Sequence, residues 1–262
     1  MSLPLTPIAA ISLTALLLVA GAINGLAGFG FALVGTMVLA TVIDPATAVV
    51  FMIVPILGVN LSLVGELSAD DLRSCGRRFT PLLGAALLGT VLGMGLIDIL
   101  PKKPLRLALG VVSLGFVVSA QGLVQIPGLG RAREGCFVES TPAMVGVGGL
   151  SGILFGGTNV GVQLVAYVRS CDLSHGLFVG VVAMVFLGLN AIRVGAAGVL
   201  GLYPDLQIVG GSVVAAGPAV VGVAIGKRFR VRVSERARRG AVLGLLTVIG
   251  FRLVAAGLGL VG

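Results

Sequence analysis

Polar side chains that could hold a small anion lie inside long apolar stretches of this sequence. The uncharged ones are Asn24, Asn60, Thr158, Asn159, Gln163 and Asn190, and the charged ones are Arg193 and Arg252. Amide and hydroxyl groups donate hydrogen bonds, and the guanidinium fork matches the oxygens of an oxyanion. No acidic residue lies deep in the same stretches. We therefore expect these residues to bind a small anionic substrate.

Arg193 is the most specific of these candidates. It lies three residues after Asn190, so the two side chains share one helix face. An ionisable residue inside a membrane span usually marks a functional site. The alternative is that Arg193 lies near a helix end and extends its charge to the lipid headgroups. Arg252, about halfway along the last apolar stretch, has the same two interpretations.

Two glycine-rich stretches must position these side chains. The stretch 21–31 interrupts the uncharged run 8–43, which as one helix would be roughly 54 Å long, against about 30 Å of bilayer hydrocarbon. Gly25, Gly28 and Gly30 therefore predict a broken helix that lines a polar pathway. The stretch 148–161 repeats the pattern with Gly156 and Gly157. The alternative interpretation is close helix packing through small residues.

The two stretches occupy corresponding places in two similar halves. Aligning Gly25 with Gly152 places Gly30 on Gly157, and an asparagine follows in the next helix of each half, Asn60 and Asn190. Interrupted segments at matching positions are the best indication in a sequence of a transporter binding site. We therefore expect the substrate to bind between the two breaks.

The composition indicates an integral membrane protein with an all-α fold. Of the 262 residues 57% are hydrophobic and 11% are charged, whereas soluble domains carry about 25% charged residues. We expect about eight transmembrane helices, with one broken or re-entrant segment in each half. The expected domains are a four-helix repeat over 1–125, a linker over 126–142 and a second repeat over 143–262. The expected spans are 8–43, 46–65, 81–100, 105–124, 143–168, 176–201, 206–226 and 240–262, with a polar loop over 66–78.

The net charge of +8 comes largely from basic residues between the apolar runs, above all in the stretch 227–239. Such residues set membrane topology and contact anionic headgroups, so we expect the lipid bilayer, and no nucleic acid, as a partner. The expected location is the plasma membrane of the cell, with several crossings. A homo-oligomer remains an option.

Enzyme chemistry has no support in the sequence. There are no paired catalytic carboxylates, no nucleophile with a partner base and no phosphate-binding loop. Three widely spaced cysteines (Cys75, Cys136 and Cys171) and the single His175 do not form a metal-ligand pattern. We expect no catalytic residues, no cofactor and no metal.

The sequence resembles the TauE/SafE family of sulfite and organosulfonate exporters. The resemblance rests on Gly21-Ala-Ile-Asn-Gly25-Leu-Ala-Gly28-Phe-Gly30 with Pro45 after it, and on Gly149-Leu-Ser-Gly152-Ile-Leu-Phe-Gly156 with Tyr167 and Asn190 after it. It covers nearly the whole chain and implies export of sulfite or small organosulfur anions. We expect alternating access around the two breaks. A passive anion channel and a non-transporting membrane scaffold subunit are the alternatives.

Overall fold

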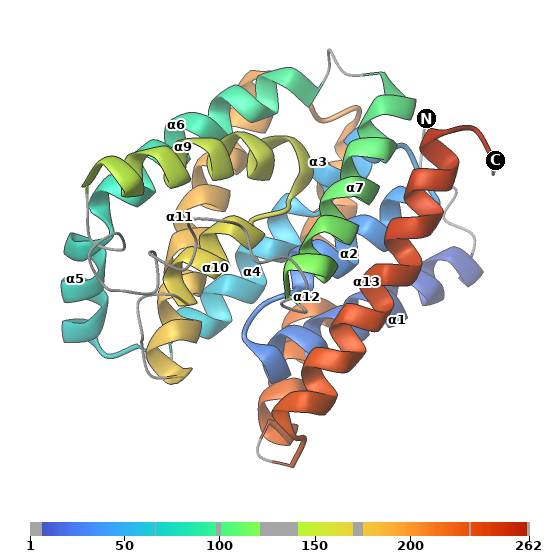
Figure 1. The fold of residues 1–262 in the computed structure, drawn as a ribbon. Helices are drawn as coiled ribbons and strands as arrows, with labels where there is room; N and C mark the ends of the chain where they lie inside the picture. The colour runs from blue at the N-terminus through green and yellow to red at the C-terminus, as the bar shows by residue number, and fades with distance from the viewer. Residues whose placement is uncertain are drawn as a thin grey trace.

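A computed structural model of the chain describes residues 7–65, 67–97, 101–120, 141–169, 175–230 and 232–260. Throughout these ranges the regular structure is helical (Figure 1). The helices are α1 (Pro7–Ala27), α2 (Phe31–Ala40), α3 (Pro45–Phe51), α4 (Ile53–Val64), α5 (Ala69–Arg78), α6 (Thr80–Ile97), α7 (Lys102–Ala120), α9 (Thr141–Thr158), α10 (Val162–Arg169), α11 (His175–Val199), α12 (Leu206–Phe229) and α13 (Glu235–Gly257). The expected all-α architecture is confirmed.

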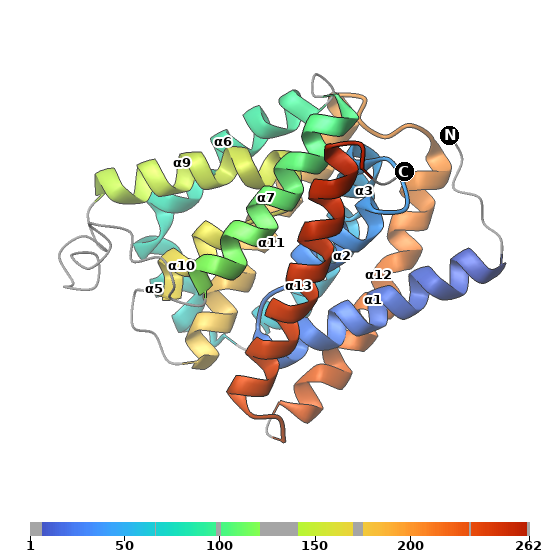
Figure 2. The same ribbon diagram turned by 45° about the vertical axis from the view of Figure 1, so that its right-hand side comes forward.

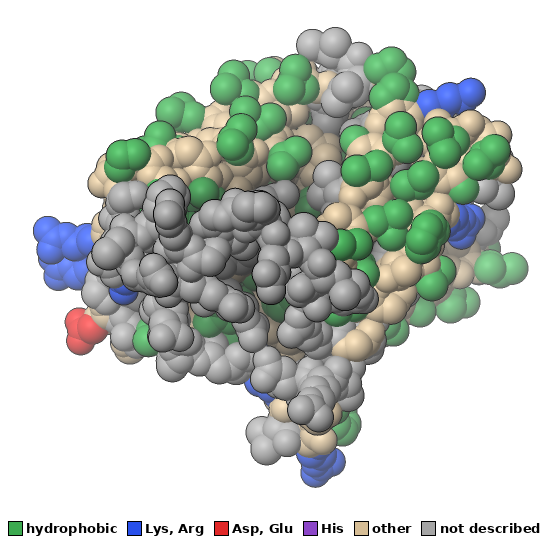
Figure 3. All heavy atoms as spheres, in the orientation of Figure 1, with side chains coloured by type: hydrophobic (Ala, Val, Ile, Leu, Met, Phe, Trp, Pro, Cys, Tyr) green, Lys and Arg blue, Asp and Glu red, His purple; other side chains and the backbone are tan. Residues whose placement is uncertain are grey.

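Four helical segments in the described part of the chain are long and apolar enough to cross a membrane. They are Pro7–Ala27, Pro45–Val64, Gly176–Val199 and Leu206–Phe229, and shorter apolar helices cover Phe31–Ala40 and Thr80–Leu96. Apolar side chains also cover much of the outer face formed by α6, α7, α9 and α13 (Figure 3). An outer surface of this kind is typical of a protein in contact with lipid. The count of eight spans stays a prediction.

The helices form pairs around a central pair. α6 packs along α9, α1 along α12 and α7 along α13, while α4 and α11 contact each other in the middle. Figure 2 shows α1 crossing α12, and α7 and α13 side by side, running in opposite directions. If the two halves are compared, α1 corresponds to α9 and α12 to α6, so the first two pairs are equivalent. This equivalence favours the predicted internal repeat, which stays a prediction together with its boundaries.

Glycines allow two of these pairs to approach closely. A Cβ atom at Gly21 or Gly25 would collide with backbone oxygens of α12, and one at Gly152 or Gly156 would collide with backbone oxygens of α6. Small residues commonly bring membrane helices this close. The packing interpretation of the glycine-rich stretches therefore holds for these four positions.

The expected span 46–65 is two short helices in series. Asp44 caps α3 by accepting a hydrogen bond from the backbone N–H of Thr47 at 3.2 Å, and Pro45 takes the first helical position. Pro55 has no N–H to offer the carbonyl of Phe51, and the Ser212 hydroxyl of α12 donates to that oxygen at 2.6 Å instead. A neighbouring helix thus satisfies the carbonyl that Pro55 leaves without its helical partner.

The expectation of a loop over 66–78 is wrong, because residues Ala69–Arg78 form α5. The charged residues of this segment favour a loop in the sequence, but they also suit an amphipathic helix at the edge of the bundle. In Figure 1 this helix lies at the periphery, beside α6.

Candidate functional site

The first break separates α1 from α2 at residues 28–30. Gly28 and Gly30 adopt φ angles of +82° and +113°, which side chains rarely allow. A Cβ atom at Gly28 would also collide with the side chain of Val179 on α11. Asn24 bridges the break, because its Oδ1 accepts a hydrogen bond from the backbone N–H of Phe31 at 3.0 Å. The end of α1 therefore holds the beginning of α2.

The second break, between α9 and α10, depends on an asparagine. Asn159 adopts a φ of +59°, and its neighbours Gly156 and Gly157 remain helical. Asparagine tolerates this left-handed conformation better than most residues. If the ends of α1 at Ala27 and α9 at Thr158 are aligned, Gly25 falls on Gly156, one helical turn from its predicted partner Gly152.

The side chain of Asn159 is fully buried and uses both ends of its amide. Its Nδ2 donates to the hydroxyl of Thr36 and to the carbonyl of Val49, each at 2.9 Å. Its Oδ1 accepts a short hydrogen bond from Arg193. Asn159 thus joins the second break to α2, α3 and α11.

Arg193 is fully buried beside the end of α9. Its guanidinium donates to Asn159, to Asn190 Oδ1 at 3.2 Å and to the carbonyl of Gly156 at 3.2 Å, and it stacks on the ring of Phe155 at 4.8 Å. Every one of these partners is neutral. A cation at the C-terminal end of a helix is stabilised by the free carbonyls there. In the described part of the chain, no carboxylate forms an ion pair with the Arg193 guanidinium.

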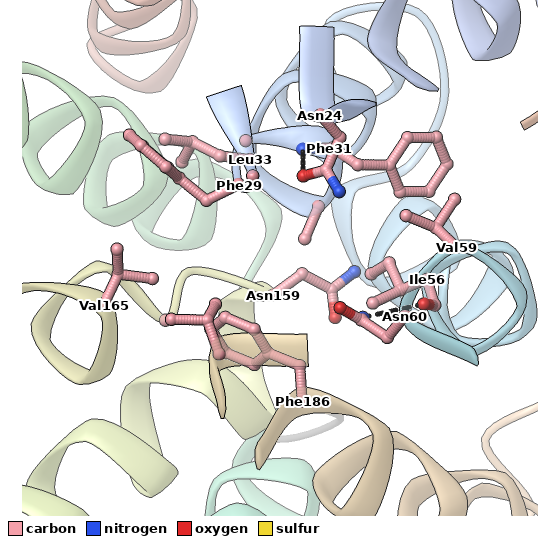
Figure 4. A pocket seen from close by; sticks show the side chains of 15 residues that line it. Asn24, Phe29, Phe31, Leu33, Ile56, Val59, Asn60, Asn159, Val165 and Phe186 are labelled. Carbon is pink, nitrogen blue, oxygen red and sulfur yellow. Dashed lines mark hydrogen bonds between the residues drawn. The ribbon is translucent and has the colours of Figure 1, made fainter. Parts of the chain in front are cut away.

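A cavity of about 40 Å³ lies between the two breaks (Figure 4). Asn24, Asn60 and Asn159 bring amide groups to it, and the start of α2 borders it from 30 to 33. The rest of its wall is apolar, with residues such as Phe29 and Phe186. On the scale by which one water needs about 10–15 Å³, this space holds roughly three waters or an anion of similar size.

The structure brings together most of the predicted site residues, though in different roles. The cavity is lined by Asn24, Gly28, Gly30, Asn60 and Asn159. Behind Asn159 lie Asn190, Arg193 and Gly156. Gly25, Gly157 and Thr158 lie in or next to the helix ends without lining the cavity, and the Thr158 hydroxyl bonds the carbonyl of Leu154.

Two predicted residues are not placed at the cavity. Arg252 is exposed on α13 and does not line it. Gln163 belongs to α10, but its side chain lies outside the described residues. The assignment of a substrate to any of these residues stays a prediction.

Some residues of the site were missed from the sequence. Nothing in the apolar run around Thr36 indicates that its hydroxyl bonds Asn159. Phe155 and Phe186 have the pattern of ordinary core residues, although their ring centroids are 5.0 Å apart beside the site. From the sequence, Lys227 and Arg230 are expected to set membrane topology and contact headgroups, or to bind a regulatory partner. In the structure Lys227 donates to the carbonyl of Ser62 at 2.8 Å and Arg230 to that of Gly25 at 2.9 Å, at the ends of α4 and α1.

Comparison with known proteins gives one match. Residues 13–253 match a protein family described as Sulfite exporter TauE/SafE, so the match spans both breaks and the cavity between them. No curated protein and no solved structure matches the chain.

Proposed function

Because the chain belongs to the TauE/SafE family of sulfite exporters, we propose that it exports sulfite or a similarly small organosulfur oxyanion across the plasma membrane. Family membership implies a membrane transporter of the sulfite-exporter type. The observation that supports binding at a particular place is the cavity between the two breaks, with the buried charge of Arg193 behind it.

The charge of Arg193 argues for an anionic occupant. A buried cation is costly, by several kcal/mol, unless an opposite charge lies near it. Neutral partners recover part of that cost, and an anion in the adjacent cavity would recover more. Asn159 lies between the guanidinium and the cavity, so the charge acts on the substrate through this amide.

The beginning of α2 supplies further donors. The N–H groups of Ala32 and Leu33 belong to the first turn, where no intrahelical partner exists, and both residues line the cavity. They lie at the positive end of the helix dipole. A cavity of about 40 Å³ suits an anion of sulfite size better than a longer sulfonate in this conformation.

Transport by alternating access would use the paired helices. The α1/α12 pair and the α6/α9 pair each join a helix from the first half of the chain to one from the second, and Asn24 of α1 and Asn159 at the end of α9 line the cavity. Rocking of one pair against the other would open the cavity to either side in turn. Because the inside of a cell is negative, the membrane potential favours anion exit by about 2.3 kcal/mol per charge per 100 mV.

The test is flux of labelled sulfite into vesicles that contain the purified protein. We expect saturable flux in the unmodified protein. In Arg193→Gln the flux should fall by about 10- to 100-fold, because the substitution removes the buried charge and hydrogen bonds of the guanidinium. Arg228→Gln is the matched control, because Arg228 is exposed on α12. Arg252→Gln tests whether the other predicted arginine takes part.

Other outcomes would favour the alternatives. Flux that rises linearly with concentration would indicate a passive channel. An intact protein with no flux of sulfite or of a small sulfonate would contradict transport and favour a scaffold subunit. Equal flux in Arg193→Gln and in the unmodified protein would remove Arg193 from the mechanism.

A further inference from the structure

Backbone groups fix the orientation of two amides on opposite sides of the cavity. Asn24 Oδ1 accepts from the N–H of Phe31 at 3.0 Å, and Asn60 Nδ2 donates to the carbonyl of Ile56 at 2.8 Å. A backbone N–H can only donate, and a carbonyl oxygen can only accept. Neither amide can therefore turn over without losing its hydrogen bond. Figure 4 shows both bonds and the two side chains at the cavity.

The remaining polar atoms of the two amides differ in hydrogen-bonding type. Asn24 Nδ2 is a donor and Asn60 Oδ1 is an acceptor, and neither has a hydrogen-bond partner among the described residues. The two side chains are only 4% and 6% exposed. Polar atoms that border a nearly enclosed cavity usually pair with water or with a ligand in it. The cavity therefore suits a ligand that accepts a hydrogen bond on one side and donates one on the other.

The charge beside the cavity is a single positive one. Among the described residues Arg193 is the one charged side chain that is fully buried, and no carboxylate, lysine or histidine lines the cavity. One negative charge would balance it. A dianion would leave a second charge unbalanced among apolar residues such as Phe29 and Phe186. The sulfite dianion also has no hydrogen to donate to Asn60 Oδ1.

We propose that the cavity selects the singly protonated monoanion of a small oxyacid, which for sulfite is hydrogen sulfite, over the dianion. This inference rests on the function proposed above and concerns the same site. The O–H group of the ligand donates to Asn60 Oδ1, and its oxygens accept from Asn24 Nδ2 and from the first turn of α2. The proton then crosses with its anion, and no acidic residue in the cavity has to carry it.

Groups near the cavity must be considered before a pH dependence is assigned to the ligand. The helices packed against α4 carry Arg193 on α11, Lys227 and Arg228 on α12 and Asp44 at the start of α3. Burial raises the pKa of the Tyr203 phenol, so it stays protonated around neutral pH. The side chain of His175, at the start of α11, lies outside the described residues. A control ligand that does not itself titrate is therefore needed, so that protonation of the protein can be distinguished from protonation of sulfite.

The experiment is calorimetric binding of sulfite to the full chain in lipid nanodiscs, between about pH 6 and pH 9. Methanesulfonate is the control ligand, because it is a permanent monoanion whose methyl group cannot donate. Above the second ionisation of sulfite, the apparent affinity for total sulfite should fall by about tenfold per pH unit, while that for methanesulfonate stays constant. An affinity for sulfite that is constant or rises with pH would overturn the proposal.

A variant tests the role of Asn60. Asn60→Leu keeps the approximate shape but removes the acceptor, so the advantage of sulfite over methanesulfonate at the acid end of the range should shrink by about tenfold. Ser62→Ala, on the same helix and outside the cavity lining, should leave that ratio unchanged. An unchanged ratio in Asn60→Leu would contradict the assigned contact.

Different results would contradict the proposed function and the proposed selection of the monoanion. If sulfite neither binds nor crosses vesicles at any pH, the proposed function itself is wrong. If sulfite binds and the dianion is the preferred form, the function stands and the selection of the monoanion is wrong. The pH profile of the unmodified protein decides this even where a variant does not fold.

Discussion

At the level of single residues, the amide of Asn159 connects three helices and the charge of Arg193. Both of its N–H groups and its oxygen are engaged, and its backbone conformation ends α9. The polar residues could be recognised from the sequence, because amides are conspicuous in an apolar run. Their partners could not, because Thr36 and the carbonyls of Val49 and Gly156 are neighbours only in the folded chain.

Asn159→Asp tests the path from Arg193 to the cavity. The carboxylate would neutralise the guanidinium and would lose both donated hydrogen bonds, so we expect sulfite binding to weaken by about tenfold or more. Calorimetry measures the affinity. Gln207→Glu makes the same amide-to-acid change at an exposed position and should have no effect. Equal affinity in the two variants would disconnect Asn159 from the site.

At the level of helices, an interruption lies within each glycine-rich stretch, but the sequence does not show which residues make it. Gly28 and Gly30, both at positive φ, lie in the first interruption. In the second, Gly156 stays helical because its bare Cα atom packs on the backbone of α6, and Asn159 ends the helix instead. A glycine that packs and a glycine that bends look alike until the neighbouring helix is known.

Gly152→Ala tests the close packing of α9 on α6. The new Cβ atom would collide with the backbone carbonyl of Ala86, so we expect the protein to lose about 1–3 kcal/mol of stability. Gly149→Ala on the same helix is the control, since a Cβ atom there meets nothing within 4 Å. It should leave the melting temperature in detergent unchanged or slightly raised. Equal melting temperatures for the two variants would argue against a tight interface.

At the scale of the whole molecule, basic residues at the end of α12 donate hydrogen bonds to the ends of two helices of the first half. Lys227 bonds the end of α4 and Arg230 the end of α1, one turn or less from cavity residues Asn60 and Asn24. The sequence indicated a cluster of basic residues here, which composition alone assigns to the membrane surface. The pairing of α1 with α12 could not be predicted, because no local pattern reports contacts between distant segments.

Removing both bonds in Lys227→Gln with Arg230→Gln should loosen these helix ends. We expect amide hydrogen exchange to quicken by roughly tenfold in the last turns of α1 and α4, because local opening becomes easier. Mass spectrometry of exchanged peptides measures the effect. Arg228→Gln should not change it, and similar exchange in all three proteins would mean that the two bonds do not hold the helix ends.

The partnership of α1 with α12 also affects how the chain is made. The ribosome releases α1 before α12, and the ~180 residues that separate the end of α1 from the start of α12 take on the order of ten seconds or more to translate. Through that interval the glycines of α1 face lipid or the insertion machinery in place of the backbone they are shaped to meet. α6 and α9 lie much closer in the chain and can join earlier. α1 thus reaches its native neighbour later than α6 does, and a chain that ends before α12 would leave the glycine face of α1 without its partner.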